Sequence, residues 1–534
     1  MLSYSAHAIQ HATTASTITK MRFTISQIVI FVANLLLLLQ KRKFKTDFYT
    51  MASIDFVRNY LLNSLQARLT EDQSQAINLL IKFLLDWGND SCFLLKGYAG
   101  TGKTTLLGAL VRALQAQSVA CVLLAPTGRA AKVLSSTAGF SATTIHREIY
   151  SIAERKDGAP SYSLRRNRHG NTLFVVDEAS MVGATANDSL SRRRGGLLGD
   201  LVEYVRSGRH CKLLLSGDDA QLPPVGESAS PALQPFILEG YFTKVFQVTL
   251  RNVLRQELES GILHFATQIR GLVEKFNGAM PQLDIQQYSD FSAIPAGRLI
   301  EMVESSYNSV GLEETVVLCR SNMRAVLFNA TIRSAIFGYE EPLVGGDRVF
   351  ACRNSYRWTK GVQEVPFIAN GDMLRIRRVY NTTQVKDFSF ADIDFALEEF
   401  PELELTATAM LNVLGSSSAA LPKKEQEELY TMRTAVLREE LGKDYSYRAV
   451  AEDPMLTALQ LKHGYALTCH KSQGGQWAHV YVDVELFPSV ARDISLLRWL
   501  YTAITRASQR VVLVMPPQEL LTPESFSALA EEQY

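Results

Sequence analysis

The chain has 534 residues, which is too long for a single hydrophobic core and predicts three or four domains. Its 47% hydrophobic and 20% charged residues are typical of a folded, soluble globular protein. The net charge is only +1, which excludes binding to a polyanion through a basic field over the whole molecule and leaves local basic patches as the only means.

The first fifty residues contain an apolar segment, Phe23 to Leu39, which is seventeen residues without a charge and at the lower edge of membrane-spanning length. If it inserted, the basic residues at 41–45 would keep the large C-terminal part in the cytoplasm. We favour the alternative that Met51 is the true start and that residues 1–50 lie outside the fold, because the globular pattern begins just after it. In both cases we expect a cytoplasmic body with no stable membrane partner.

Six cysteines are widely scattered, with no C-x-x-C pair, and most lie in apolar runs. This pattern indicates reduced core thiols of a cytosolic protein and not metal ligands or disulfides. The six are Cys92, Cys121, Cys211, Cys319, Cys352 and Cys469.

The informative part of the chain begins at Leu69, where a helical stretch opens. Thr70 is a suitable N-cap, and Gln73 three residues later would complete a capping box. A side-chain amide about thirty residues before a phosphate-binding loop could instead recognise the adenine of a nucleotide, because it can both donate and accept at the base edge. Both interpretations of Gln73 stay open on spacing alone.

Residues Gly97 to Thr104 spell a phosphate-binding P-loop, whose glycines let several backbone N–H groups point at a polyphosphate. The apolar run Cys92 to Leu95 predicts a strand before it, and Thr105 to Leu114 predicts a helix after it, which places the phosphates on a helix N-terminus. A glycine-rich turn matched by chance is the alternative, and the flanking elements argue against it. The loop alone indicates ATP or GTP. The predicted contacts to the nucleotide are Gly97, Gly100, Thr101, Gly102, Lys103, Thr104 and Thr105, with Lys103 on the β- and γ-phosphates and the Thr104 hydroxyl on Mg²⁺.

Four strand-like runs alternate with helical stretches, which predicts a parallel α/β sheet covered on both faces. Ligands collect at the carboxyl ends of the strands in such sheets, and each run ends in a polar cluster there. The runs are Cys92 to Leu95, Cys121 to Ala125, Leu173 to Val176 and Lys212 to Leu215.

Asp177 and Glu178 directly follow the third run. Neighbouring strand residues point in opposite directions, so Asp177 can join the Mg²⁺ shell while Glu178 acts as the general base toward the attacking water. A solvated strand end is the alternative.

After the fourth run, within Gly217 to Gly226, Gln221 is suited to sensing the γ-phosphate, and the rigid pair Pro223-Pro224 could transmit that state toward a bound strand.

In these motifs the chain resembles superfamily 1 helicases of class B, especially the RecD-like and Dda-like DNA helicases. The resemblance runs from about Leu69 to Pro516, with nine motifs in family order: Leu69 to Gln73, Gly97 to Thr104, Ala125 to Ala130, Thr144 to His146, Asp177 to Ser180, Gly217 to Gly226, Leu254 to Gln256, Ala466 to Gly474 and Tyr501 to Ala507. It implies that a nucleic-acid strand is contacted by Pro126, Thr127, Thr144, His146, Val225, Thr468, His470 and Lys471.

The second half of the chain contains the strand-like runs Val316 to Cys319, Val480 to Val484 and Val511 to Met515, which predict another α/β sheet. The two sheets would clasp ATP between them. The resemblance implies that Arg255 and Arg506 are arginine fingers, which would stabilise charge on the transferred phosphoryl group. For either arginine alone, a surface salt bridge is the alternative.

The segment Thr468 to Gly474 matches the part of these helicases that couples the nucleotide state to the affinity for the nucleic-acid strand. We also count Gly474 among the predicted nucleotide contacts. Related motors often carry a Glu two residues after this glycine to hold the ribose. Here the place is taken by Gln476, which can hydrogen-bond but carries no charge.

Two insertions distinguish the chain from a bare pair of sheets. Residues 149–170 lie where family members carry a small strand-separating pin, although a solvated basic loop is an equal alternative. Residues 342–463 contain glycine-rich turns between β-rich runs and predict a small, SH3-like β-barrel domain. Within it, the stretch 391–438 is expected to turn acidic and helical.

The expected fold is therefore α/β, with two RecA-like domains in tandem. Residues 51–250 would form the first domain and residues 251–341 with 464–534 the second. The expected function is an ATP- and Mg²⁺-dependent DNA helicase that moves along single-stranded DNA, 5′ to 3′ by class resemblance. It would act on tailed duplex DNA as a monomeric motor, with replication or repair proteins as further partners. The alternatives are an RNA helicase of the same superfamily and a nucleotide-gated DNA-binding switch with little turnover.

Overall fold

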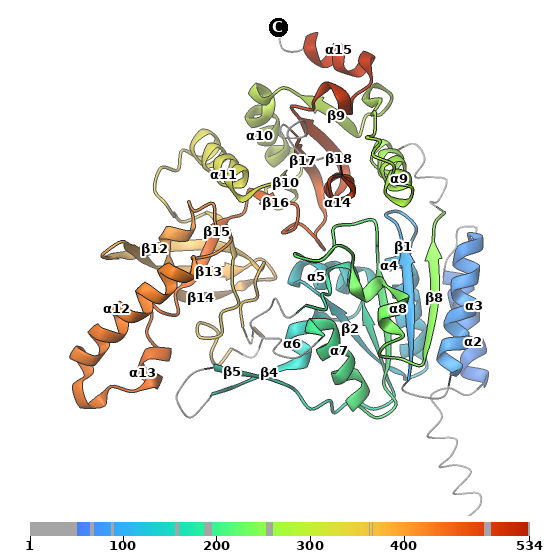
Figure 1. The fold of residues 1–534 in the computed structure, drawn as a ribbon, viewed down its shortest axis with the longest axis horizontal. Helices are drawn as coiled ribbons and strands as arrows, with labels where there is room; N and C mark the ends of the chain where they lie inside the picture. Colours follow the sequence, from blue (N-terminus) through green and yellow to red (C-terminus); the bar gives the residue numbers. More distant parts are fainter. Residues whose placement is uncertain are drawn as a thin grey trace, which may run out of the picture.

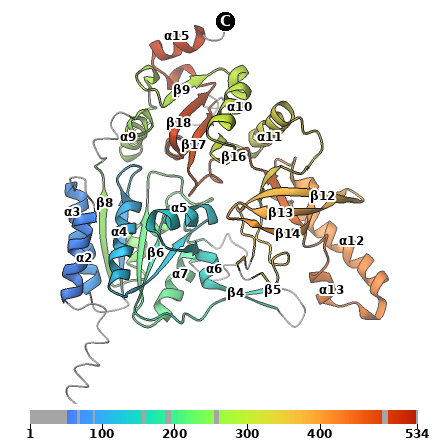
Figure 2. The same cartoon turned by 180° about the vertical axis from the view of Figure 1, so that it is seen from behind.

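The computed structural model describes residues 51–64, 69–86, 90–154, 160–185, 195–252, 260–362, 364–365, 367–484 and 493–531. Residues 1–50, with the apolar segment 23–39, lie outside the described residues. Across the described ranges, no helix is both long and apolar enough to cross a bilayer. Figures 1 and 2 show two α/β units, one above the other, with a barrel beside them.

The first unit is a six-stranded parallel sheet in the order β3-β2-β6-β7-β1-β8. It contains the four predicted strands, and β3 and β8 extend it at its two edges. The strands are β1 (Ser91–Gly97), β2 (Ala120–Ala125), β3 (Ala142–Thr144), β6 (Thr172–Val176), β7 (Lys212–Gly217) and β8 (Lys244–Leu250). The helices are α2 (Met51–Ser64), α3 (Glu71–Leu85), α4 (Lys103–Ala116), α5 (Gly128–Ala138), α6 (Ile145–Ile149), α7 (Gly196–Ser207) and α8 (Pro235–Leu238).

Strand β6 shows why this sheet is covered on both faces. Its five residues are all buried. Leu173 and Val175 join the core formed with α2, α3 and α4, whereas Phe174 and Val176 join the core formed with α6 and α7. Side chains alternate between the faces of a strand, so a continuous apolar run fits only where both faces are packed.

The second unit is a five-stranded parallel sheet in the order β16-β10-β17-β18-β9, which confirms the prediction of two tandem α/β sheets. Its strands are β9 (Phe291–Ile294), β10 (Thr315–Cys319), β16 (Ala466–Thr468), β17 (Trp477–Asp483) and β18 (Ala507–Val514). Its helices are α9 (Gly261–Glu274), α10 (Leu299–Ser309), α11 (Asn322–Phe337), α14 (Ile494–Ile504) and α15 (Pro523–Glu531).

The insertion between α11 and β16 contains a closed five-stranded barrel, as predicted. Its strands are β11 (Arg348–Ala351), β12 (Met373–Val385), β13 (Phe388–Leu397), β14 (Phe400–Met410) and β15 (Leu459–His463). Helices α12 (Lys423–Leu441) and α13 (Tyr447–Ala451) lie on the side of the barrel away from the first sheet (Figure 1).

The expectation that 391–438 is helical is wrong for its first half, because residues 391–410 belong to β13 and β14. In β14, Leu405, Ala407 and Ala409 pack into the barrel core, whereas Glu402 and Glu404 are exposed. The acidic residues thus mark the outer face of a strand, and the period of two identifies it. The helix begins only at Lys423.

Residues 149–170 contain a two-stranded antiparallel hairpin of β4 (Tyr150–Glu154) and β5 (Pro160–Leu164). It leaves the first unit after α6 and extends toward the side where the barrel lies (Figures 1 and 2).

Candidate nucleotide-binding site and strand surface

The P-loop joins β1 to α4, as the sequence pattern requires. Gly100 and Gly102 have φ angles of 73° and 81°, in the left-handed region that favours glycine. A Cβ at Gly97 would lie 2.9 Å from Thr101 Oγ1 and 3.1 Å from Leu250 Cβ, so the close approach of β8 also requires glycine there.

Lys103 extends along the inside of this loop. Its Nζ donates to the carbonyl oxygens of Gly97 at 2.7 Å and of Tyr98 at 3.0 Å. The ammonium group is thereby held inside the loop, where a phosphate of the nucleotide would bind. Thr105, also predicted to contact ATP, lies in the first turn of α4.

Asp177 lies at the end of β6 and meets Thr104 across the sheet. The Thr104 hydroxyl donates to Asp177 Oδ2 at 3.2 Å, and the Ser216 hydroxyl donates to Oδ1 at 2.9 Å. Burial raises the pKa of Asp177, as does the neighbouring Glu178, whereas Lys103 lowers it. A buried carboxylate beside a hydroxyl is an oxygen donor set that fits Mg²⁺, which typically takes few protein ligands and the rest from phosphates and water.

Glu178 follows Asp177 in the left-handed region, with φ of 53° and ψ of 37°. This conformation is uncommon for a residue other than glycine and turns the chain sharply after the strand. Glu178 and Asp177 therefore serve different parts of the site. Arg506 of the second unit approaches Glu178, with Nη1 3.9 Å from Oε1.

Arg506 is 4% exposed, so it is a buried residue and not part of a surface salt bridge. Its Nε donates to Thr502 O at 3.1 Å and its Nη1 to Gly475 O at 3.2 Å. These bonds fix the guanidinium at the boundary between the units. The other predicted arginine finger, Arg255, lies in residues 253–259, outside the described residues.

Gln221 is buried in the loop after β7, and its Oε1 has no hydrogen-bond partner within the described part of the chain. Buried side-chain polar atoms are normally paired. The unpaired Gln221 oxygen, at the carboxyl edge of the sheet and in the same loop as Asp218, can therefore accept a hydrogen bond from a ligand or from water.

Gln73 takes part in the capping box and also touches the P-loop. Its Oε1 accepts from Thr70 N at 3.2 Å, and its Nε2 donates to Thr101 O at 3.2 Å. The capping alternative is therefore realised. Adenine recognition by Gln73 stays a prediction, and it would require these bonds to rearrange.

Gly474 has a φ of 71°, and a Cβ there would lie 2.8 Å from Ala130 Cβ and 3.0 Å from Thr127 Oγ1. Its close neighbours thus belong to the start of α5. The structure places Gly474 against the predicted strand-binding loop, and its role as a nucleotide contact stays a prediction.

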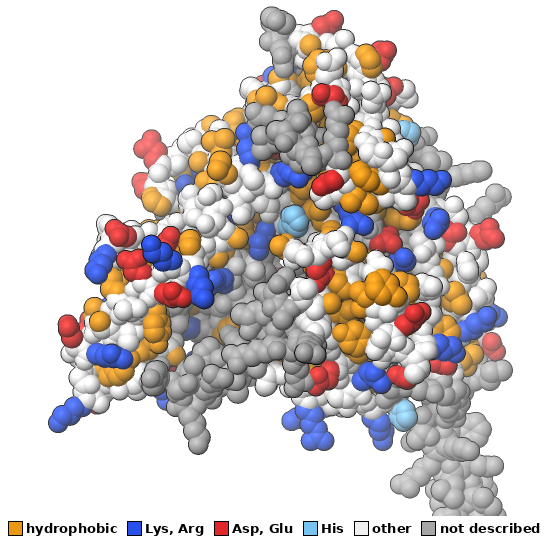
Figure 3. Space-filling view, in the orientation of Figure 1, with side chains coloured by type: hydrophobic (Ala, Val, Ile, Leu, Met, Phe, Trp, Pro, Cys, Tyr) orange, Lys and Arg blue, Asp and Glu red, His pale blue; other side chains and the backbone are white. Residues whose placement is uncertain are grey.

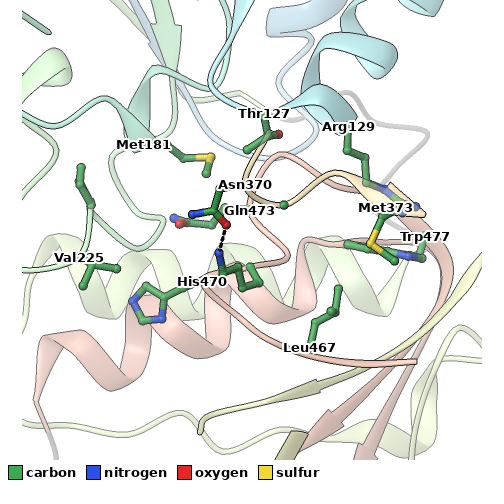
Figure 4. Close-up of a pocket in the computed structure, with 13 residues that line it drawn as sticks. Thr127, Arg129, Met181, Val225, Asn370, Met373, Leu467, His470, Gln473 and Trp477 are labelled. Atoms are coloured by element: carbon green, nitrogen blue, oxygen red, sulfur yellow. Dashed lines mark hydrogen bonds between the residues drawn. The ribbon is translucent and has the colours of Figure 1, made fainter. Parts of the chain in front are cut away.

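A cavity of about 270 Å³ lies where the two units and the barrel meet (Figure 4). Four predicted strand contacts line it, namely Thr127, Val225, His470 and Lys471, whereas Pro126, Thr144, His146 and Thr468 are not among its lining residues. The full lining comprises Thr127, Arg129, Met181, Pro224, Val225, Asn370, Gly371, Met373, Leu467, His470, Lys471, Gln473 and Trp477.

The lining combines apolar surface with a few cations. The Lys471 ammonium donates to Asn370 Oδ1 of the barrel at 2.6 Å, and the Arg129 guanidinium stacks 3.9 Å above the Trp477 ring. Val225 is 72% exposed. Such a mixture suits a strand whose phosphates need cations and whose bases need apolar contact. On the face drawn in Figure 3, acidic and basic side chains are interspersed over the coloured surface, so positive charge is local here.

Thr127 and Thr144 have a local structural role as N-caps. Thr127 Oγ1 accepts from Ala130 N at 3.2 Å, and Thr144 Oγ1 accepts from Arg147 N at 3.2 Å. A hydroxyl has one donor proton besides its acceptor lone pairs, so capping is compatible with donation to a phosphate oxygen. His146, beside Thr144 in α6, lies with its ring centroid 5.7 Å from that of Tyr150.

The sequence did not indicate that Asp218 and Tyr501 belong to the site, although both lie within recognised motifs. The Tyr501 hydroxyl donates to Asp218 Oδ2 at 2.6 Å. The two residues are 283 positions apart, and no local pattern pairs them.

Comparisons with known proteins agree with this arrangement. An AAA domain model matches residues 68–298, and a UvrD-like helicase C-terminal domain model matches residues 463–514. The ATP-dependent DNA helicase Dda of Enterobacteria phage T4 is 25% identical over 328 residues, which cover 60% of this chain and 70% of Dda. The ATP-dependent RecD2 DNA helicase of Deinococcus radiodurans is 28% identical over 210 residues, which cover 37% of this chain but only 24% of RecD2.

Among solved structures, a Pif1 helicase from Bacteroides in complex with ADP-AlF3 and single-stranded DNA aligns with a TM-score of 0.41 and 16% identity, covering 87% of this chain and 97% of that one. The two family models match in the order expected for a helicase core, and relatives named as DNA helicases align with the chain. The chain is therefore similar to the superfamily 1 helicases of the RecD- and Dda-like type.

Proposed function

We propose that this protein is an ATP-dependent DNA helicase that translocates on single-stranded DNA and unwinds duplex DNA. The observation that carries the proposal is the meeting of three groups at one boundary: Lys103 in the P-loop, Glu178 beside the buried Asp177, and Arg506 from the second unit. Binding of a nucleotide alone would need neither a general base nor a cation from across the boundary.

Hydrolysis follows from the roles of these side chains. Lys103 and the loop amides hold the β- and γ-phosphates. Thr104 and Asp177 would hold Mg²⁺, which neutralises charge on the phosphate oxygens. Glu178 accepts a proton from the attacking water, and the Arg506 guanidinium stabilises charge on the transferred phosphoryl group. Because Arg506 belongs to the second unit, turnover requires the two units to be closed.

The strand surface explains how turnover could move the protein. The cavity is lined by both α/β units and by the barrel, so a change in the angle between the units changes its shape. In the proposed inchworm cycle, ATP binding closes the two units, and hydrolysis with release of the products reopens them. The affinity for the DNA strand alternates between the two units during the cycle. The 5′-to-3′ polarity is proposed from the class resemblance. The β4–β5 hairpin is proposed as the strand-separating pin.

The proposed domain organisation follows the two sheets. Residues 51–250 form the ATPase domain, residues 251–341 and 464–534 the second helicase domain, and 342–463 the accessory barrel. The proposed form is a monomeric motor whose partners are single-stranded and tailed duplex DNA, together with replication or repair proteins.

The test is an unwinding assay on duplexes with a 5′ or a 3′ single-stranded tail, run beside ATP turnover with DNA or RNA as the stimulating strand. We expect ATP-dependent unwinding from the 5′ tail and stimulation by DNA. Unwinding only from the 3′ tail would reject the polarity. Stimulation by RNA alone would indicate an RNA helicase, and ATP binding without turnover would indicate a switch.

A further inference from the structure

The P-loop is bonded directly to the second unit. The backbone N–H of Ala99 donates to the Tyr501 hydroxyl at 3.0 Å, although the two residues are 402 positions apart. The same hydroxyl donates to Asp218 Oδ2 at 2.6 Å. Tyr501 and Asp218 are both fully enclosed, at 1% and 0% exposure. One hydroxyl of α14 therefore joins the loop after β1 to the loop after β7.

The residue before Ala99 reinforces this junction. Tyr98 is 5% exposed and packs in the core that includes Ile262 and Phe265 of α9. Its hydroxyl bonds to Glu274, and the Arg270 guanidinium stacks 4.2 Å above its ring. The first half of the P-loop is thus held by the second unit, whereas Gly102 to Thr104 belong to the first.

The next residue of α14 continues the contact toward the strand cavity. The Thr502 hydroxyl accepts from Leu222 N at 2.9 Å. Leu222 O in turn accepts from Gln473 Nε2 at 2.6 Å, and Gln473 lines the cavity. A run of buried and partly buried hydrogen bonds therefore extends from a P-loop amide to the strand surface, through consecutive residues of one helix.

We propose that Tyr501 is a positioning residue that transmits strand binding to the P-loop, by holding the Ala99 amide and the Asp218 carboxylate in one frame with α14. This role rests on the proposed function. A strand that moves Gln473 and Leu222 displaces Thr502, and Tyr501 shifts with it because the two are neighbours on a rigid helix. The hydroxyl touches Ala99 and not the amides from Gly102 onward, so it affects the rate of turnover more than the affinity for ATP.

A purely structural hydrogen bond would behave differently. Loss of the hydroxyl leaves a partly buried amide and a buried carboxylate oxygen without this partner, which destabilises the fold in either case. Only a positioning role changes the ratio of ATP turnover with single-stranded DNA to turnover without it. That ratio is the decisive readout, since spatial continuity of a contact network does not by itself demonstrate coupling.

The experiment compares Tyr501→Phe with Tyr481→Phe. Tyr481 is also fully buried, and its hydroxyl bonds to Ser306 and to Met302 O within the second unit, away from the P-loop. ATP turnover is measured with and without oligo(dT), and thermal unfolding is recorded for each variant. We expect Tyr501→Phe to lower the stimulation ratio by about tenfold with the KM for ATP within about threefold of the native value, and Tyr481→Phe to keep the native ratio.

A native stimulation ratio in Tyr501→Phe, or an equal fall in both variants, would overturn the role. If Tyr501→Phe does not fold, Thr502→Val tests the same connection one residue further along, with the same expected loss of stimulation. Absence of strand-stimulated turnover in the native protein would overturn the proposed function itself, so the two failures are distinguishable.

Discussion

The Arg506 guanidinium and the Glu178 carboxylate lie 3.9 Å apart, although they belong to different α/β units. Arg506 is held by backbone carbonyls of Thr502 and Gly475, and the left-handed backbone of Glu178 sets the direction in which its side chain leaves the end of β6. The contact between them is therefore not one between two flexible surface side chains, since the Arg506 guanidinium is buried and hydrogen-bonded in place. The proposed base and the proposed finger are therefore aligned by the packing of the units against each other.

The first prediction concerns Arg506. The substitution Arg506→Lys keeps a positive charge but removes the planar fork that can bond to two oxygens at once. We expect ATP turnover to fall by about 100-fold or more, with ATP binding reduced only a few-fold, because the finger acts on charge that develops during transfer.

The matched control for Arg506 is Arg510→Lys, on the neighbouring strand β18. Steady-state turnover and binding of a fluorescent ATP analogue would be measured for both variants. Near-native turnover of Arg506→Lys would contradict the assignment.

The second prediction separates binding from chemistry. Glu178→Gln retains the size of the side chain but cannot accept the proton, so we expect ATP to stay bound while turnover falls by about 10²- to 10⁴-fold. Lys103→Ala removes the cation inside the P-loop and should abolish strand-stimulated turnover, largely through loss of binding.

Glu239→Gln, an exposed residue after α8, is the control for the loss of one carboxylate. The measurements are equilibrium ATP binding and single-turnover hydrolysis. Native turnover in either Glu178→Gln or Lys103→Ala would remove the basis of the proposed ATPase site.

The local sequence pattern is sufficient to predict those parts of the site whose residues are contiguous in the chain. The glycines and Lys103 of the P-loop, and Asp177 beside Glu178, lie on short segments whose geometry follows from a strand end and a helix start. The sequence could not show that Tyr501 reaches Ala99, because only the packing of two sheets brings together residues 402 positions apart.

For the barrel, prediction from sequence fails for a different reason. Turns and β-rich runs predict the barrel, but the acidic composition of β14 favours a helix, and only the alternation of buried and exposed residues identifies the strand. The sequence also does not show that Asn370 and Met373 line the strand cavity, since these residues become neighbours of Lys471 only when the inserted barrel packs against the second unit.

The third prediction concerns the strand surface. Lys471→Ala removes one cation from the cavity, so affinity for single-stranded DNA should fall for all sequences alike. The slope of log affinity against log salt concentration should become shallower by about 0.7, the value for one phosphate contact on a single strand.

Lys275→Ala is the control for this loss of charge, because Lys275 is an exposed lysine at the end of α9 and does not line the cavity. Fluorescence anisotropy over a range of salt concentrations provides the measurement. An unchanged slope for Lys471→Ala would show that this ammonium does not contact a phosphate.

The fourth prediction concerns His463, at the junction between the barrel and the second unit. His463 is 7% exposed, and its Nδ1 lies 3.8 Å from Asp347 Oδ1. Asp347 is already paired with Arg333 through two bonds of 2.8 Å and accepts from the Tyr465 hydroxyl. Burial lowers the pKa of His463 to about 4, although Asp347 opposes this effect.

The sign of the pH dependence follows from these values. Between pH 6.5 and 4 the unfolded chain binds a proton at His463 and the folded chain does not, so acid favours unfolding. This residue alone should lower the free energy of unfolding by up to about 1.4 kcal/mol for each pH unit in that window. Above pH 6.5 both states are neutral at this position and the contribution is constant.

We therefore expect His463→Gln to show a shallower loss of stability between pH 6.5 and 4 than the native protein, measured by urea unfolding at closely spaced pH values. His264→Gln is the control, because the exposed His264 lies beside the rings of Phe265 and Tyr288 without being enclosed. Equal slopes for the native protein and His463→Gln would mean that the histidine binds its proton equally well in the folded and unfolded states, and that the Asp347 carboxylate fully offsets burial at this junction.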